Sequence, residues 1–221
     1  MVRSVRVYAN FGNPTETFMQ SPTSIRRLVI GVSGASGIQY AVTALKLLRN
    51  LNVETHLVVS KAGHLTRAHE TDVSREELEA LASVNYGIAD VGAALSSGSF
   101  ATMGMIILPC SMRTLAAIAT GMSDSLLTRA ADVTLKERRR LVLMTRETPL
   151  HLIHLRNMQT VTDAGAVIFP PVPAFYTRPT SIDDIVTHSV VRALDLFGLD
   201  AKPIPRWGET IKIGQREGAM A

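Results

Sequence analysis

The sequence predicts a single α/β domain built on a mainly parallel sheet with helices on both faces. Strand-like and helix-like segments alternate along the chain, and the strand-like segments are almost continuously apolar. Strands buried on both faces have this composition. The 221 residues, of which 46% are hydrophobic, can bury one substantial core and leave little room for a second full domain.

The elements follow in chain order. Apolar runs predict strands at 27–32, 52–63, 103–111, 140–147 and 166–176. Helical patterns predict helices at 37–50, 62–70, 74–83, 114–137, 149–165 and 181–198, with a break near Gly121. Ser181 is a good N-cap for the last helix. Ligands of such sheets bind at the carboxyl ends of the strands, so the residues after each strand are candidates for a site.

The two ends of the chain differ from its middle. Residues 1–24 show no helical or strand period, which predicts a flexible extension before the domain at 25–200. Residues 201–221 form a tail that we expect in subunit contacts. The basic residues of the extension, with no acidic residue before Glu16, leave a mitochondrial presequence as the alternative to plain disorder.

Composition narrows the function classes. The net charge of +4 is mild and only 5% of residues are aromatic, so neither a nucleic-acid surface nor a base-stacking platform is expected. The single cysteine, Cys110, excludes an internal disulfide and favours a reducing, cytoplasmic setting. We interpret Cys110 as a small buried residue.

Charges break every apolar run short of a membrane span. The histidines lack a familiar metal-ligand set, and His56 and His188 are interpreted as structural.

The stretch GVSGASG follows the first strand, at residues 31–37. Its glycines allow the backbone to approach a phosphate, and the next helix offers free N–H groups. The spacing differs from the dinucleotide pattern, and Ser60 rather than an acid ends the second strand. A mononucleotide is therefore favoured over NAD, with a plain tight turn as the alternative.

Polar residues follow the later strands as well. Ser111 and Thr114 either cap a helix or bind a ligand, and Arg113 beside them favours a ligand. Arg146 and Glu147 end the fourth strand, where a functional role is favoured over a surface ion pair. We expect the basic run 138–140 to be solvated, because it precedes that strand at the opposite end.

Several stretches occur in one order along the chain: GVSGASG, VVSKAG, HETDV, SSGSF, LPCSMRTLAAIATG, LLTRAADVTLKERRRLVLMTRETPL, IHLRNM and PPVPAFYTRP. Together they resemble the UbiX-type flavin prenyltransferases, which include the phenolic-acid-decarboxylase partner proteins. The resemblance covers about Arg26 to about Asp200, and PRWGE in the tail extends it. Arg113 departs from the lysine that is common there but keeps the charge.

The resemblance implies a flavodoxin-like or Rossmann-like three-layer sandwich that assembles into homododecamers with active sites at subunit contacts. It implies transfer of a dimethylallyl group from dimethylallyl phosphate to N5 and C6 of reduced FMN, without a metal. The prenylated FMN would serve a UbiD-type decarboxylase, in ubiquinone synthesis or in aromatic-acid breakdown.

The resemblance also implies site residues, position by position. FMN contacts fall on Gly34, Ala35, Ser36, Ser60, Ser111, Met112, Arg113, Thr114 and Arg146. Dimethylallyl phosphate contacts fall on Arg129, Lys136, Tyr176 and Arg192. Catalytic roles fall on Glu70 and Glu147 as acid–base groups, on Ser36 in support, and on Lys136 at the leaving phosphate.

Three other functions compete with this one. A non-catalytic FMN carrier or subunit of an aromatic-acid decarboxylase complex would bind FMN without changing it covalently. A flavin-dependent cysteine decarboxylase shares the sheet, but it needs a loop resembling PASANT where this chain has PCSMRT, residues 109–114. A nucleic-acid binder is disfavoured because the chain contains no recognised module of that kind.

Overall fold

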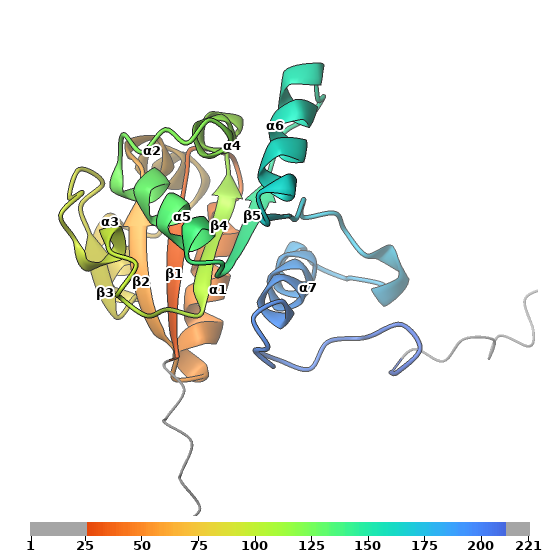
Figure 1. Ribbon diagram of the computed structural model, residues 1–221. Coiled ribbons are helices and arrows are strands. Elements are labelled where there is room, and N and C mark those ends of the chain that lie inside the picture. The colour runs from red at the N-terminus through yellow and green to blue at the C-terminus, as the bar shows by residue number, and fades with distance from the viewer. Residues whose placement is uncertain (1–25, 211–221) are drawn as a thin grey trace, which may run out of the picture.

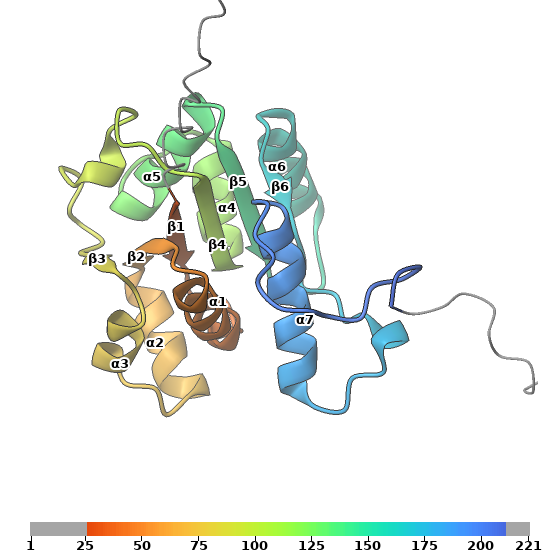
Figure 2. The same cartoon turned by 90° about the horizontal axis from the view of Figure 1, so that it is seen from below.

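The structure, a computed structural model, describes residues 26–210, which form three layers (Figures 1 and 2). The middle layer is a six-stranded sheet in the order β3-β2-β1-β4-β5-β6, and every neighbouring pair is parallel. The strands are β1 Arg27–Val32, β2 Glu54–Val59, β3 Val84–Tyr86, β4 Gly104–Cys110, β5 Arg140–Thr145 and β6 Val167–Ile168. The strand order reverses between β1 and β4, which is where open α/β sheets bind ligands.

Helices cover both faces of the sheet. Figure 2 shows α1, α2, α3 and α7 on one face and α4, α5 and α6 on the other. The α-helices are α1 Ile38–Asn50, α2 Lys61–Glu70, α3 Arg75–Ala80, α4 Met112–Ala119, α5 Leu126–Lys136, α6 Leu152–Asp163 and α7 Ile182–Asp195. The short 3₁₀ helices are η1 Ala94–Ser96 and η2 Phe175–Thr177.

The core has two halves, one on each face of the sheet. Leu28 and Ile30 of β1 pack with α1 and α7, whereas Val29 packs with α4 and α5. Gly31 supports this close packing, because a Cβ there would lie 2.6 Å from Leu127 Cδ1 of α5. The central strands are therefore buried on both faces, as their continuous apolar sequence predicts.

The predicted elements are confirmed, with three differences. β3 was not predicted, because a three-residue edge strand has too little sequence for a periodic signal. β6 is only two residues long, since prolines follow it. α6 begins at Leu152 rather than at Pro149, which follows a cis peptide bond, and His151 is its N-cap.

Part of the predicted ends lies beyond this description. The expected extension, residues 1–24, and the tail beyond residue 210 lie outside the described residues. The nearer part of the tail packs on α7, where Arg206 pairs with Asp195 at 2.7 Å. Within residues 26–210, no helix has the length and apolar character needed to cross a bilayer.

Candidate functional site

A cavity of 590 Å³ lies at the carboxyl ends of β1, β2 and β4. Gly34, Ser60 and Ser111, which follow these three strands, line it together with the start of α5. Its volume falls within the range of about 300–1,000 Å³ that is typical of small-molecule sites. The sheet therefore places several of the predicted flavin contacts around one cavity at the point where the strand order reverses.

Three helices begin at this cavity, each with a serine at its N-cap. The hydroxyl of Ser60 accepts from Gly63 N at 3.0 Å, that of Ser111 from Thr114 N at 3.4 Å, and that of Ser125 from Thr128 N at 3.4 Å. Capping uses one N–H of each helix, and other first-turn N–H groups have no intrahelical acceptor. Because the positive ends of three helix dipoles converge there, the cavity is suited to a phosphate.

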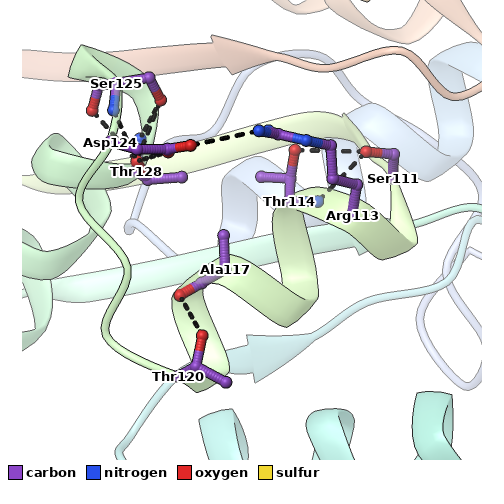
Figure 3. Close-up of polar contacts among 8 residues, drawn as sticks. All are labelled: Ser111, Arg113, Thr114, Ala117, Thr120, Asp124, Ser125 and Thr128. Carbon is purple, nitrogen blue, oxygen red and sulfur yellow. Dashed lines mark hydrogen bonds and ion pairs between the residues drawn. The ribbon is translucent and has the colours of Figure 1, made fainter.

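Figure 3 shows the side of this cavity formed by α4 and α5. Arg113 donates to Asp124 at 3.2 Å and so links the starts of the two helices. The hydroxyl of Thr114 accepts a hydrogen bond from Ser111. Ser111 thus has the capping role that the sequence left open for it and for Thr114, while the largely exposed Arg113 supplies positive charge beside the cavity.

Ser33 is a site-supporting residue that the sequence analysis missed. It is buried, and its hydroxyl donates to Pro109 O at 2.9 Å while its Oγ accepts from Ser111 N at 2.7 Å. The hydroxyl therefore fixes the end of β1 against the end of β4. Its position inside GVSGASG was visible in the sequence, but its burial was not.

The glycine loop differs from the prediction in one respect. We expected the first N–H groups of α1 to be free for a phosphate, and this is wrong. The Glu70 carboxylate accepts from Gly37 N at 2.8 Å and from Ile38 N at 3.1 Å. A side chain at the end of α2 therefore already occupies the anion position at the start of α1.

The charge of Glu70 is stabilised by its surroundings. Partial burial alone would raise its pKa, but hydrogen bonds from Ser36, Gly37 and Ile38, together with nearby Arg146, outweigh burial and lower the pKa of the carboxyl. Ser36, Glu70 and Arg146 thus form one group at the carboxyl edge of the sheet. The lowered pKa favours the ionised form of Glu70.

Arg146 and Glu147 follow β5 at the same edge. Both are exposed, and the Glu147 carboxylate accepts from Thr148 N at 3.0 Å. Among the described residues no ion pair joins the two side chains, so the surface-pair alternative has no support in this chain. Both side chains are accessible to a ligand or to another subunit.

Lys136, which is predicted to bind dimethylallyl phosphate, ends α5 away from this edge, whereas Arg129 directly follows Thr128, which lines the cavity. Arg129 pairs with Asp132 at 2.6 Å and donates to Ser96 O at 3.2 Å, and Lys136 pairs with Glu137. Lys136 ends α5 just before β5, whereas Arg146 follows β5. A six-residue strand spans about 20 Å, so Lys136 and Arg146 lie at opposite edges of the sheet.

The basic run 138–140 is not uniformly solvated, which corrects the prediction for one of its members. Arg138 and Arg140 are exposed as expected. Arg139 instead donates from its two terminal nitrogens to Gly98 O at 2.6 Å and to Phe100 O at 2.8 Å. This contact could not be predicted from the sequence, because the acceptors are backbone carbonyls about 40 residues earlier.

Tyr176 and Arg192 form a third group beside α7. Tyr176 lies edge-on to His188 and to Trp207, with ring centroids 6.1 and 5.5 Å apart. Arg192 pairs with Asp195 at 2.8 Å. Both predicted donor-binding side chains are exposed at the surface of the chain.

The other residues considered as candidates are structural. Cys110 is buried, as predicted, and burial raises the pKa of its thiol to about 12, which disfavours the nucleophilic thiolate. His56 is buried and bonds both Tyr86 Oη at 2.9 Å and Glu54 Oε1 at 3.0 Å. A larger cavity of 710 Å³ lies between α1 and α7, and none of the predicted site residues lines it.

One chain thus brings together some predicted residues and separates others. Gly34, Ser60, Ser111, Arg113 and Thr114 line the 590 Å³ cavity. Ser36, Glu70, Arg146 and Glu147 lie at the same edge of the sheet. Arg129 with Lys136, and Tyr176 with Arg192, form two further groups elsewhere on the chain.

Comparison with known proteins gives one consistent family. The flavoprotein family matches residues 18–194. The flavin prenyltransferase UbiX of Neisseria meningitidis serogroup B is 60% identical over 183 residues, which cover 83% of this chain and 97% of that protein.

Two solved structures are similar over most of the chain. AnUbiX in complex with FMN and dimethylallyl pyrophosphate is 56% identical with a TM-score of 0.81, covering 82% of this chain and 97% of that one. A dodecameric FMN-dependent UbiX-like decarboxylase from Escherichia coli is 50% identical with a TM-score of 0.80, covering 82% and 98%.

Proposed function

The chain belongs to the flavoprotein family and, within it, to the UbiX flavin prenyltransferases, and from that premise we propose that it prenylates FMN. The reaction joins the dimethylallyl group of dimethylallyl phosphate to N5 and C6 of reduced FMN. The product is prenylated FMN, and inorganic phosphate leaves.

The observation that carries this proposal is the 590 Å³ cavity, where three capped helices begin. Its converging N–H groups and Arg113 fit the phosphate of a mononucleotide, and Leu127 and Ile88 give it apolar surface. Ser60, Ser111 and Thr114 hold the phosphate end, and Gly34, Ala35, Ser36, Met112 and Arg146 complete the FMN contacts. Bound reduced flavin supplies the electron-rich ring positions that take the prenyl group.

The residues that bind dimethylallyl phosphate act on its phosphate, which is the leaving group. Breaking the allylic C–O bond places growing negative charge on the departing phosphate, and fixed cations stabilise that charge. Arg129, Lys136 and Arg192 provide positive charge, and the Tyr176 hydroxyl provides a further donor.

Ring closure at C6 requires removal of a proton. Glu147, exposed beside Arg146, is the proposed base. Glu70 is already bonded to Gly37 N and Ile38 N, so we assign it the orientation of the glycine loop and of Ser36 in addition to a proton-transfer role.

The complete site draws on more than one chain. Lys136 and Arg146 are separated by the length of β5, about 20 Å, whereas their proposed roles place both side chains beside the reacting flavin and prenyl phosphate. We therefore assign them to different sites of a homo-oligomer, with each site completed by a neighbouring copy. The dodecameric relative supports a homododecamer.

The remaining expectations extend this proposal. The product passes to a UbiD-type decarboxylase, the protein works in the cytoplasm, and the reaction needs no metal. The mild charge of +4 and the absence of a nucleic-acid module agree with a small-molecule enzyme.

An anaerobic assay tests the proposal. Purified protein is mixed with reduced FMN and dimethylallyl phosphate, or in a parallel sample with reduced FMN and dimethylallyl diphosphate. The mass of the extracted flavin is then measured by mass spectrometry. We expect a gain of one five-carbon prenyl unit. Unmodified FMN bound to folded, assembled protein with either donor would instead support the non-catalytic carrier.

A further inference from the structure

The segment Ser96–Phe100, which begins at the last residue of η1 and precedes β4, lies against Arg129 and Lys136 of α5. Arg129 donates to Ser96 O at 3.2 Å. A Cβ added to Gly98 would lie 2.7 Å from Lys136 Nζ and would overlap the Glu137 carboxylate. The position of this segment and the positions of the Arg129 and Lys136 side chains therefore depend on one another.

Arg139 holds the middle of this segment. Its guanidinium donates to Gly98 O at 2.6 Å and to Phe100 O at 2.8 Å, so both terminal nitrogens are used. A planar guanidinium can serve two carbonyls at once, whereas a lysine ammonium is a compact point charge with no fixed fork. Phe100 is fixed further by Arg27, whose guanidinium carbon lies 4.9 Å from the ring centroid.

We propose that Arg139 is a positioning residue for binding of the donor phosphate. Its two hydrogen bonds fix Ser96–Phe100, and the fixed segment holds Arg129 and Lys136 in place for the phosphate. Arg139 itself does not touch the substrate. The inference deepens the proposed function and rests on its assignment of Arg129 and Lys136 to the donor.

Loss of Arg139 has a specific physical consequence. Two carbonyls of the segment lose their donors, and the segment gains conformational freedom. Binding of the phosphate must then order the segment as well, which weakens the affinity for the donor. The flavin cavity is spared, because neither Arg139 nor any residue of Ser96–Phe100 lines it.

The test compares Arg139→Gln with Arg140→Gln, a matched loss of one charge at the exposed neighbouring position. For Arg139→Gln we expect the half-saturating concentration of dimethylallyl phosphate to rise about tenfold, since two hydrogen bonds are lost. FMN affinity should stay unchanged, and Arg140→Gln should match the wild type. An unchanged half-saturating concentration in Arg139→Gln, or an equal rise in Arg140→Gln, overturns the proposal.

A purely structural role predicts another pattern. It would lower the Tm and the active fraction of Arg139→Gln without changing the half-saturating concentration of the donor. Restoring the charge with Arg139→Lys should recover only part of the donor affinity, because one ammonium does not replace the fork. Full recovery in Arg139→Lys would contradict the two-carbonyl role.

Gly98→Ala gives a second route if Arg139→Gln fails to fold. The added methyl group meets the flexible ends of Lys136 and Glu137 rather than backbone, so the chain can fold while Lys136 is displaced. We expect a similar rise in the half-saturating donor concentration. An unchanged value in folded Gly98→Ala would overturn the proposal.

Hydrogen exchange separates this inference from the proposed function. In the wild-type oligomer, dimethylallyl phosphate should slow amide exchange across residues 96–100, and Arg139→Gln should lose that protection. If the wild type makes no prenylated FMN but shows this pattern, the transferase fails and the positioning role stands. If the wild type prenylates FMN and both proteins are protected equally, the positioning role fails alone.

Discussion

The flavin cavity and the donor-binding residues are organised differently. The cavity is complete within one chain, because strands that meet at one edge of the sheet present three helix starts to the same space. The residues assigned to dimethylallyl phosphate fall into two groups, one on α5 and one beside α7, and the three cations Arg129, Lys136 and Arg192 are each paired with a local acid. The difference fits our proposal that the cavity holds the flavin within one chain, whereas assembly completes the site for dimethylallyl phosphate.

The largest expected effect separates chemistry from flavin binding. Glu147→Gln should slow prenylation by about 100-fold or more, because it removes the proposed base at ring closure. FMN binding should be unchanged, since Glu147 lies outside the 590 Å³ cavity. Single-turnover mass spectrometry of the flavin measures the rate. Turnover at the wild-type rate would remove Glu147 from the mechanism.

The next effect concerns Tyr176 and Arg192, the proposed dimethylallyl phosphate contacts beside α7. Arg192→Ala should raise the half-saturating concentration of dimethylallyl phosphate by about 10- to 100-fold, the loss of one charge-assisted contact. Titration of the donor at saturating FMN measures this value. Arg178→Ala is a matched control, because it removes an exposed arginine nearby that has no assigned role. An unchanged half-saturating concentration of dimethylallyl phosphate in Arg192→Ala would contradict the assignment of Arg192 to the phosphate.

A smaller effect concerns the glycine loop. Glu70→Ala should lower the free energy of unfolding by about 1 kcal/mol, the value of a helix cap. Because the folded pKa of Glu70 is lowered, its stabilisation is full above the ordinary value of 4.5 and is lost as the pH falls through the folded pKa.

Denaturant unfolding at several pH values tests this linkage. The wild type and Glu70→Ala should differ at pH 7 and converge at acid pH. A constant difference at all pH values would show that the Glu70 charge does not stabilise the start of α1.

For the exposed residues Arg138 and Arg140, we expect substitution to leave the prenylation activity unchanged. The double variant Arg138→Gln with Arg140→Gln should keep wild-type activity, because both side chains are exposed. Steady-state prenylation at low donor concentration measures this most sensitively. Lost activity with intact assembly would mean that the whole basic run, and not Arg139 alone, supports the donor site.

The sequence predicts the fold well because its central strands are buried on both faces. Continuous apolar runs mark β1, β4 and β5, and Gly37 and Ser111 mark the starts of the helices that follow β1 and β4. β3 escaped prediction because a short edge strand owes its conformation to its neighbour β2. Because the carboxyl ends of parallel strands meet at one edge of the sheet, the sequence also placed Ser60, Ser111 and Arg146 correctly at that edge.

Long-range contacts explain what the sequence could not predict. Glu70 reaches α1 from a helix about 30 residues later, and Ser33 joins the ends of two strands about 75 residues apart. Arg139 acts on carbonyls, which carry no sequence signature. Local pattern finds helix starts and strand ends, but the partner of a side chain depends on the tertiary fold.

Complementation in mixed oligomers tests the shared site most directly. Lys136→Ala and Arg146→Ala, each expected to be inactive, are co-expressed, and prenylation by the mixed assembly is measured. If the two side chains serve sites through different chains, random mixing should restore about a quarter of the sites. Lys136→Ala mixed with Arg129→Ala is the control, because one chain contributes both residues, and it should stay inactive. A Lys136→Ala and Arg146→Ala mixture that assembles yet stays inactive would contradict the shared site.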